Sequence, residues 1–558
     1  MYNVVELFSG IGSQARALKN LGQDVNVLGT CEWDVHAIIA YDLLNNPKEI
    51  PDSVETMSKK QLLEILKAYT FSNTGKEPLD YESLRTYSEE SLKRLYTAIL
   101  RNNNFVDINM LSGFNMPDNI DILTYSFPCQ DLSNVGAFHG YNKGIDKDSG
   151  SRSSLLWQVG RILSEMNELG KPLPRFLLME NVPALLSKRH FPNFTQWITD
   201  LRDLGYVSQY FQLNAAEFGL PQNRPRLLMI SVYVGDNEAE NELLLKFFKT
   251  ISEDNIVGNY KESPYYHDYK ITDLLRQDYS NVELFEEARE CTPNDTVSRR
   301  KIWDENPQLV LPGYVHNKNY NMIRTITTKQ DRNPNSGNLY FESGLPGRAG
   351  FRYLTPRECM LFMGFEDKDY EKLKNNNIEF HKGDALFARD KIIRLSGNSI
   401  PVKLLEGIFF QVLKIDHLLK DFRKLEQIGV QKDNKEQIRK IKKYMFSHGV
   451  RSRLSSGPYP KYADILYPCH RTAIYICDCF WGGHGCDMSS LPEYNWEFWN
   501  DQISAWAERT EEGVISAKEM GWNPVVIWKC ELSEGEFERT MINLLKQIKG
   551  KALDEVAC

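Results

Sequence analysis

The first 34 residues alternate between apolar runs and turns in an order that few folds accept. An apolar run over residues 2–8 leads into Ser9-Gly10-Ile11-Gly12-Ser13, and a helical pattern follows over residues 14–21. A second apolar run over residues 25–30 ends in Cys31-Glu32-Trp33-Asp34. A strand, a glycine turn, a helix, a second strand and an acidic residue open a doubly wound α/β sheet. The sequence therefore predicts such a sheet, with a nucleotide-like ligand at the turn.

The remaining sequence predicts more than one domain, because 558 residues exceed the usual size of a single core. Apolar runs typical of sheet strands return at residues 120–127, 176–180 and 226–232. The predicted sheet domain covers residues 1–235, with a helical insertion at about 45–104, and returns at 351–419 after a small irregular domain at 236–350. A charged linker at 420–434 then leads to a second, smaller domain at 435–558.

Charge and hydropathy limit the partners of the chain. The net charge of −8 does not exclude DNA, because DNA affinity depends on where Lys and Arg are placed. Residues 420–453 hold eleven Lys/Arg against four Asp/Glu, and a solvated helix face explains this excess as well as a phosphate contact does. No apolar run is long enough to span a membrane and no signal peptide is evident at the start, so we expect no membrane partner and a cytoplasmic location.

Three short segments after predicted strands carry the chemistry. Phe127-Pro128-Cys129-Gln130 offers a thiolate, and a thiolate that adds to C6 of cytosine makes C5 reactive toward an electrophile. Glu180 offers an acid that can protonate N3 of the ring as the thiolate adds. Arg224 and Arg226 offer two guanidiniums, one for the base carbonyl and the other for a phosphate.

These segments, in this order, resemble the cytosine-C5 DNA methyltransferase family from Val4 to about Leu413. Further segments that fit the family are Glu32-Trp33, Asp107-Ile108, Arg152-Ser153-Ser154-Leu155, Arg352 to Glu358, Gly397-Asn398-Ser399 and Pro401-Val402. The resemblance implies a Rossmann-like sheet that binds S-adenosylmethionine, a small target-recognition domain at 236–350, and a cytosine flipped out of double-stranded DNA. It also implies a prokaryotic or phage origin.

The resemblance assigns roles residue by residue. Cys129 is the nucleophile that bonds transiently to C6, Glu180 is the acid at N3, and Arg226 fixes the ring together with Arg224. The implied cofactor-binding residues are Phe8, Gly10, Gly12, Glu32, Trp33, Asp107, Ile108, Pro128, Leu155, Asn398 and Ser399. Polar residues of the target-recognition segment that are candidates for DNA contacts are Arg299, Arg300, Arg324, Thr325, Thr327, Gln330 and Asn333. Two rivals, a nicotinamide oxidoreductase and a DNA-binding regulator, do not explain why nucleophile, acid and arginines occur together.

The C-terminal segment holds a second constellation. Cys479, His484, Cys486 and Cys530 are thiolate and imidazole ligands of the kind and number that bind structural zinc. Asp464 precedes a predicted strand, where nucleases of the PD-(D/E)XK type hold a divalent metal such as Mg²⁺.

Together with Cys479-Phe480-Trp481 these residues resemble the very-short-patch (Vsr) mismatch endonucleases, which nick beside thymine–guanine mismatches. The resemblance implies an α/β endonuclease domain in which Phe480 and Trp481 wedge between base pairs. This chain has Cys477 and Gly482 where the family has histidines, so Asp478 is a further candidate metal ligand. Three alternatives therefore stay open: mismatch nicking, a restriction-type nuclease, or a DNA-binding module that does not cleave. A restriction enzyme as partner and the oligomeric state also stay open.

Overall fold

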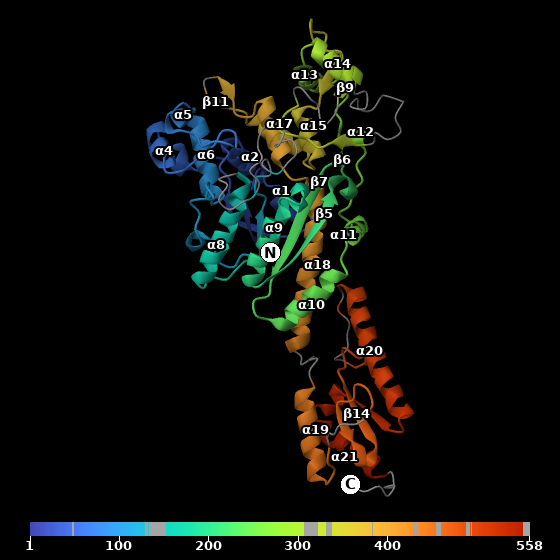
Figure 1. Ribbon diagram of the computed structural model, residues 1–558. Coiled ribbons are helices and arrows are strands. Elements are labelled where there is room, and N and C mark those ends of the chain that lie inside the picture. Colours follow the sequence, from blue (N-terminus) through green and yellow to red (C-terminus); the bar gives the residue numbers. More distant parts are fainter. Residues whose placement is uncertain are drawn as a thin grey trace. The chain divides into compact units, whose positions relative to one another are not determined.

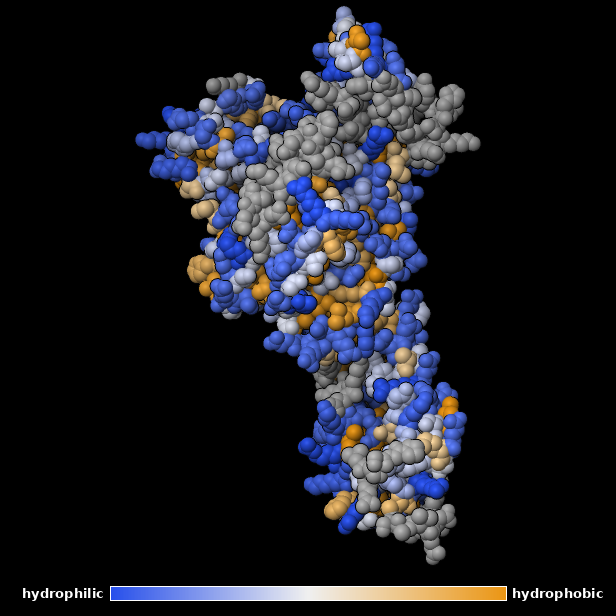
Figure 2. All heavy atoms as spheres, in the orientation of Figure 1, coloured by the Kyte–Doolittle hydropathy of each residue, from blue (hydrophilic) through white to orange (hydrophobic). Residues whose placement is uncertain are grey.

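The computed structural model describes two compact units, residues 1–412 and 413–558 (Figure 1). The described residues are 1–46, 49–128, 132, 145, 152–305, 322–330, 338–381, 383–427, 434–452, 459–486, 492 and 494–550. The visible surface of each unit is mostly hydrophilic (Figure 2). Within the part of the chain that is described, no helix combines the length and the apolar character needed to cross a membrane.

The first unit is built on a six-stranded sheet of order β2-β1-β3-β4-β7-β5. The strands are β1 (Tyr2–Leu7), β2 (Val25–Cys31), β3 (Ile122–Tyr125), β4 (Phe176–Asn181), β5 (Tyr206–Asn214) and β7 (Pro225–Tyr233). The first four are parallel to one another, and β7 runs antiparallel to both β4 and β5. The carboxyl ends of β1 to β4 therefore meet at one edge, and the predicted Rossmann-like sheet is confirmed.

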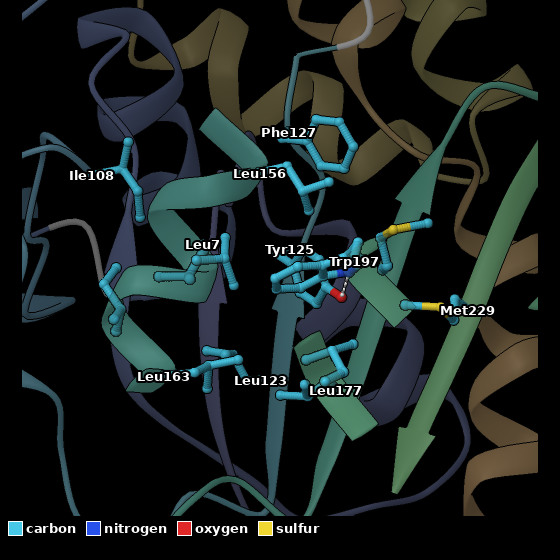
Figure 3. Packing of buried hydrophobic residues seen from close by; sticks show 14 of the residues in the cluster. Leu7, Ile108, Leu123, Tyr125, Phe127, Leu156, Leu163, Leu177, Trp197 and Met229 are labelled. Atoms are coloured by element: carbon cyan, nitrogen blue, oxygen red, sulfur yellow. Dashed lines mark hydrogen bonds between the residues drawn. The ribbon is translucent and has the colours of Figure 1, made fainter. Parts of the chain in front are cut away.

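One face of the sheet is covered by α8 (Leu156–Glu168) and α9 (Phe191–Asp203), which share one apolar cluster with the strands (Figure 3). Trp197 of α9 is fully buried, and its indole N–H donates to the Tyr125 hydroxyl at 3.1 Å. The one polar atom of this large side chain is thus satisfied inside the core, as burial requires.

The other helices of the first unit belong to the insertion, to the segment 236–350 and to the return of the chain. The insertion forms α3 (Asp52–Glu55), α4 (Lys59–Leu66), α5 (Tyr81–Arg85) and α6 (Glu89–Arg101). α1 (Ser13–Asn20) and α2 (Val35–Asn45) precede it, and α15 (Pro356–Phe362), α16 (Asp367–Asn375), α17 (Arg389–Asn398) and α18 (Val402–Gln427) follow the segment 236–350. α2 contacts α6, α16 and α17, so the insertion packs on helices of the sheet domain.

The segment 236–350 is more regular than its sequence predicts. It forms α10 (Glu238–Lys249), α11 (Glu253–Lys261), α12 (Ile271–Leu274), α13 (Val282–Glu290) and α14 (Val297–Glu305), and the short strands β8 (Ile323–Arg324) and β9 (Asn338–Tyr340). α10 buries Leu243, Leu244, Phe247 and Phe248, whose spacing places them on one face of a helix, and it contacts β5. The first helices of the segment 236–350 therefore pack against the sheet domain.

A group of charged side chains joins this segment to the return of the chain. The guanidinium of Arg352, next to α15, pairs with Glu358 at 2.7 Å, and neither side chain is exposed. Arg357 of α15 pairs with Glu287 of α13 at 2.9 Å. Removing one partner of such a buried pair leaves an uncompensated charge, so the pair of Arg357 with Glu287 holds α13 against α15.

The second unit is a three-stranded sheet with helices on both faces. β14 (Thr472–Cys477) pairs antiparallel with β13 (Ile465–Tyr467) and parallel with β15 (Asn523–Trp528). Ile474 and Ile476 face a core made with α19 (Lys435–Ser447) and α21 (Phe537–Lys549). Ala473 and Tyr475 face the opposite side, where Ala517 of α20 (Trp496–Glu519) packs. The alternation along β14 gives the α/β layering that was expected of this unit.

Candidate methyl-transfer and metal sites

The glycine turn after β1 is held in an unusual backbone conformation. Phe8, Gly10 and Gly12 have φ angles of 59°, 54° and 84°, in the left-handed region that glycine tolerates best. A Cβ on Gly12 would lie 2.7 Å from Asn45 Nδ2 and 2.9 Å from a ring carbon of Tyr41, so no side chain fits there. A Cβ on Gly10 would meet no atom within 4 Å. The space beside Gly10 is thus open to a ligand.

Glu32, after β2, orders this turn. One carboxylate oxygen accepts from the Gly10 amide at 3.0 Å, and the other accepts from the amides of Trp33 and Asp34, each at 2.9 Å. Burial, and next the neighbouring Asp34 carboxylate, raise the pKa of Glu32 to about 7. The structure therefore brings the glycine turn and the acid after the second strand into direct contact.

The remaining predicted cofactor residues fall into three groups. Ile108 lies in the apolar cluster of Figure 3, with Phe8 and Leu155 packed against it. Ser399 lies 2.5 Å from Ser13 Oγ in the glycine turn, which brings the return of the chain to the turn, whereas Asn398 is exposed. Asp107 accepts from Asn109, while Trp33 and Pro128 are half-buried. The open space at Gly10, the Glu32 carboxylate and the apolar wall together form a site that fits a nucleoside.

Glu6 is a residue of this site that sequence reasoning missed. It lies near the carboxyl end of β1, is fully buried, and accepts from the Ala15 amide at 2.9 Å and from the Tyr41 hydroxyl. Burial raises its pKa to about 6. A carboxylate among apolar strand residues was the available signal, because such a group must find partners when it is buried.

Glu180 and Arg226 form an ion pair on neighbouring strands. Glu180 of β4 lies opposite Leu228 of β7, so Arg226, two residues away along β7, lies on the same face of the sheet. Arg226 Nε lies 2.8 Å from a Glu180 carboxylate oxygen, and both side chains are nearly buried. Burial raises the pKa of Glu180, and the charges of Arg226 and then Arg224 oppose this rise. The two residues predicted to handle the base are therefore brought together.

Arg224 does not lie beside them in the predicted role. It is 2% exposed, and its guanidinium donates to the carbonyls of Ile326 at 2.7 Å, Gly397 at 2.9 Å and Ser399 at 2.8 Å. These contacts tie the segment 236–350 and the end of α17 to the strand that carries Arg226. The donors that a phosphate or a base would need are directed to the backbone.

Cys129 lies outside the described residues, but the chain before it is fixed at two points. Asn181, which follows Glu180, donates to the Phe127 carbonyl at 3.0 Å. Ser153 Oγ donates to the Pro128 carbonyl at 2.6 Å. The sequence does not predict either role, because hydrogen bonds to a distant backbone leave no local pattern.

The candidate DNA contacts of the segment 236–350 have several partners within the protein. Arg299, Thr325 and Thr327 donate to the carbonyls of Asn294, Asn223 and Lys329, and Arg300 pairs with Asp295. Gln330 is buried and Arg324 is exposed, while Asn333 lies outside the described residues. Among the described candidates, Arg324 is exposed and its side chain forms no hydrogen bond or ion pair within the described part of the chain.

The four predicted metal ligands of the second unit come together. The ligand atoms of Cys479, His484, Cys486 and Cys530 all lie within 4.8 Å of one another. Cys530 Sγ lies 3.7 Å from His484 Nδ1. Tetrahedral zinc, with bonds of about 2.3 Å to sulfur and about 2.0 Å to nitrogen, implies an edge of about 3.5 Å between two such ligands. The donor set and its spacing therefore fit zinc.

The two aspartates considered as metal ligands in the second unit, Asp464 and Asp478, have different hydrogen-bond partners. Asp464 accepts from the Ile476 amide at 2.7 Å and from Asn434 Nδ2 at 3.3 Å, and burial raises its pKa. Asp478 accepts from the amides of Phe480 and Trp481 and pairs with the Lys529 ammonium at 3.1 Å. Asp478 thus caps a turn and pairs with a lysine, in place of the metal-ligand role considered for it.

The expected DNA wedge is also packed away in this conformation. Phe480 and Trp481 are 0% and 2% exposed, and both rings contact the ring of Trp499 from α20. The expectation that these side chains point toward DNA is therefore wrong for this conformation. Large aromatic surfaces bury themselves wherever a helix can cover them, and the sequence did not reveal that α20 does so.

Comparisons with known proteins follow the division into two units. Residues 84–414 match the family model of the C-5 cytosine-specific DNA methylases, and residues 416–488 match that of the DNA mismatch endonuclease Vsr. The chain is 31% identical over 419 residues to the orphan methyltransferase M.SssI of Spiroplasma monobiae, covering 73% of this chain and 96% of that protein. It is 30% identical over 424 residues to the type II methyltransferase M2.ScrFI of Lactococcus lactis subsp. cremoris, covering 74% and 99%.

The second unit has relatives of its own. Over 131 residues the chain is 30% identical to the type II nicking enzyme V.XorIIP of Xanthomonas oryzae pv. oryzae, covering 23% of this chain and 96% of that protein. A family model that matches more than half of the chain and relatives covered almost end to end settle the family. The chain belongs to the C-5 cytosine-specific DNA methylases and carries a C-terminal domain similar to the Vsr mismatch endonucleases.

Proposed function

We propose that the first unit methylates C5 of cytosine at a short site in duplex DNA through a transient bond between Cys129 and C6 of the ring. The observation that carries this proposal is the ion pair between Glu180 and Arg226 on β4 and β7. An acid with a raised pKa, held beside a guanidinium, suits a ring that must be protonated at N3 and held at its carbonyl.

Each described residue then has a distinct task. Glu180 donates a proton to N3 as the thiolate adds, and Arg226 orients the carboxyl group and the base. Asn181 and Ser153 hold the chain that leads to Cys129, and Arg224 is a positioning residue that fixes the strand carrying Arg226. After methyl transfer a water-derived base removes the C5 proton, and elimination releases Cys129. The cytosine must leave the duplex to reach these groups.

The glycine turn is the proposed binding site of S-adenosylmethionine, which supplies the electrophilic methyl group. Glu32 faces the turn through the Gly10 amide and is the candidate partner of the ribose hydroxyls. The open space beside Gly10 allows the ligand to approach the backbone of the turn closely. Ile108, Phe8 and Leu155 supply the apolar wall.

Trapping on a modified base tests the covalent step. We expect a duplex with 5-fluorocytosine at the target position to form an adduct with the protein that survives denaturation, because C5 then has no proton to lose after methyl transfer. The adduct requires S-adenosylmethionine and is absent in Cys129→Ser. An adduct of equal yield in Cys129→Ser would contradict the assignment of the nucleophile, and so would active protein that forms no adduct.

The same proposal gives the second unit a nicking activity at thymine–guanine mismatches in the site that the first unit methylates. Its support is the match to the Vsr family and the half-buried carboxylate of Asp464 beside β13 and β14. Mg²⁺ in such sites is commonly held by one or two carboxylates together with substrate phosphates and water, so a single Asp464 ligand is sufficient from the protein side. Activating water against the phosphodiester is the chemistry that the ion would supply.

Asp464→Asn tests whether this unit cleaves. We expect nicking of a mismatched duplex with Mg²⁺ to fall by about a hundredfold or more, because the amide cannot neutralise the cation. Asp501→Asn, an exposed change on α20, serves as the control and is expected to keep full activity. Nicking of the fully paired site would favour a restriction-type nuclease instead. Binding without any nicking by the unchanged protein would favour the non-cleaving module.

A further inference from the structure

The outer side of α19 carries a shallow groove that the proposed chemistry does not use. The groove has a volume of about 570 Å³ and is lined by Lys435, Ile438, Arg439, Lys442, Lys443, Phe446, Arg451 and Ser452. The six of these residues that belong to α19 recur three, four and seven positions apart, so they share one face of the helix, and Arg451 and Ser452 follow the helix end at Ser447. The opposite face buries Ile441 and Met445 in the core of the second unit.

Five of the eight lining residues are cationic, and none is acidic. Among the described residues, no carboxylate forms an ion pair with Arg439, Lys442 or Lys443, whereas Lys440 on the flank of the same helix pairs with Glu436 at 2.7 Å. The chain as a whole is acidic, with a net charge of −8, so this concentration of positive charge is local. Unpaired cations on a single face suit an anionic partner that is itself extended.

The floor of the groove is apolar. Ile438 is half-buried, and Phe446 is 63% exposed beside the Arg451 guanidinium, which lies 5.7 Å from the ring centre. A guanidinium resting on an aromatic ring is spread flat and keeps its outer N–H groups available. Arg451 therefore lines the same groove as the cationic residues of α19.

The length of the row of cationic side chains from Lys435 to Lys443 indicates which anion fits. Lys435 and Lys443 are eight positions apart, about 12 Å along a helix that rises about 1.5 Å per residue. One strand of duplex DNA advances about 3.4 Å per phosphate along its axis, so the row spans about three to four phosphates. We infer that the α19 face (Lys435, Arg439, Lys442, Lys443 and Arg451) binds the phosphate backbone of duplex DNA and anchors the second unit on its substrate. This inference rests on the proposed action of that unit on DNA, and it needs no cleavage.

Removing three of these charges tests the inference in the full-length protein. The variant is Arg439→Gln/Lys442→Gln/Lys443→Gln, and the matched control is Lys518→Gln/Lys546→Gln/Lys549→Gln, which removes three exposed lysines from α20 and α21. Binding to a fluorescent mismatched duplex is measured over a range of salt concentrations. Each lost phosphate contact lowers the slope of log K against log salt by about one. For the α19 variant we expect the magnitude of this slope to fall by about three and binding to weaken at least tenfold. The control should keep nearly the same slope and affinity.

A second measurement isolates the α19 face from DNA bound by the first unit. Lysine acetylation with and without duplex DNA, read by mass spectrometry, is expected to show protection of Lys435, Lys442 and Lys443, and none of Lys518, Lys546 or Lys549. Equal reactivity of the α19 lysines with and without DNA would overturn the inference, and so would an equal salt slope for variant and control. Protection by an acidic polypeptide but not by DNA would overturn it in favour of a protein partner.

Both measurements are independent of catalysis. If Asp464→Asn and the unchanged protein both fail to nick, while the α19 lysines are protected, the nicking proposal fails and the DNA anchor stands. If nicking is normal and the α19 variant binds and cleaves as well as its control, the anchor fails alone. Far-ultraviolet circular dichroism confirms that α19 remains folded, which is expected because the three changes leave Ile441 and Met445 in place.

Discussion

Glu180→Gln is expected to lower the rate of methyl transfer by about 10²-fold to 10⁴-fold, the range that a positioned general acid contributes. The amide can still accept a hydrogen bond from Arg226 Nε, which lies 2.8 Å from the carboxylate, but its N–H groups are too weakly acidic to protonate N3. Single-turnover transfer of labelled methyl groups to duplex DNA measures the effect. The loss should lie in the chemical step, with the affinity for DNA changed far less.

The pH dependence of the same reaction separates an acid from a structural partner. The pKa of Glu180 is raised by burial, so the protonated form is favoured, and the rate is expected to fall as pH rises through that pKa. Glu180→Gln should remove this fall. The control is Glu168→Gln, an exposed change near the end of α8, which should keep both rate and profile. An unchanged pH profile in Glu180→Gln would contradict the acid role.

Loss of the metal is expected to destabilise the second unit and spare the first. Cys486→Ser removes one of four clustered ligands, and structural zinc contributes on the order of 5 kcal/mol or more to small domains. We expect the zinc content to fall from about one per chain to near zero. The unfolding midpoint of the second unit should drop by about 10 °C or more, since 1 kcal/mol shifts it by a few degrees. Elemental analysis and calorimetry measure the two effects.

Cys477→Ser is the matched control for the metal site. Cys477 is a buried thiol in β14, and its sulfur lies 3.8 Å from Thr510 Oγ1, outside the ligand cluster. It should keep its zinc, and methyl transfer should be normal in both variants. Equal zinc loss in Cys477→Ser, or full zinc retention in Cys486→Ser, would show that the cluster is not the binding site.

The features of the fold that sequence predicts are those with a local cause. β1, the glycine turn, α1 and β2 follow one another within 31 residues, and each leaves a periodic or glycine signal. The order β4-β7-β5 depends on pairings across the chain, which hydropathy does not specify. The sequence analysis predicts an irregular segment in place of α10, because the strand pattern of the sheet domain is absent there. The helical spacing of Leu243, Leu244, Phe247 and Phe248 is the signal that indicates the helix.

The candidate sites show the same division. Glu180 and Arg226 were predicted because each follows or lies on a recognisable strand. Arg224 was paired with Arg226 on spacing alone, yet it precedes β7, which begins at Pro225, so strand alternation does not set its direction. Its carbonyl partners lie more than one hundred residues away along the chain, where no sequence pattern points to them.

Bisulfite sequencing of DNA from cells that express this chain, beside cells that express Cys129→Ser, tests the central claim most directly. The account predicts that cytosine in one short sequence context is protected from conversion in the first sample and not in the second. Protection that persists in Cys129→Ser would contradict the proposed nucleophile. No protected cytosine in cells with abundant folded protein would contradict the methyltransferase account itself.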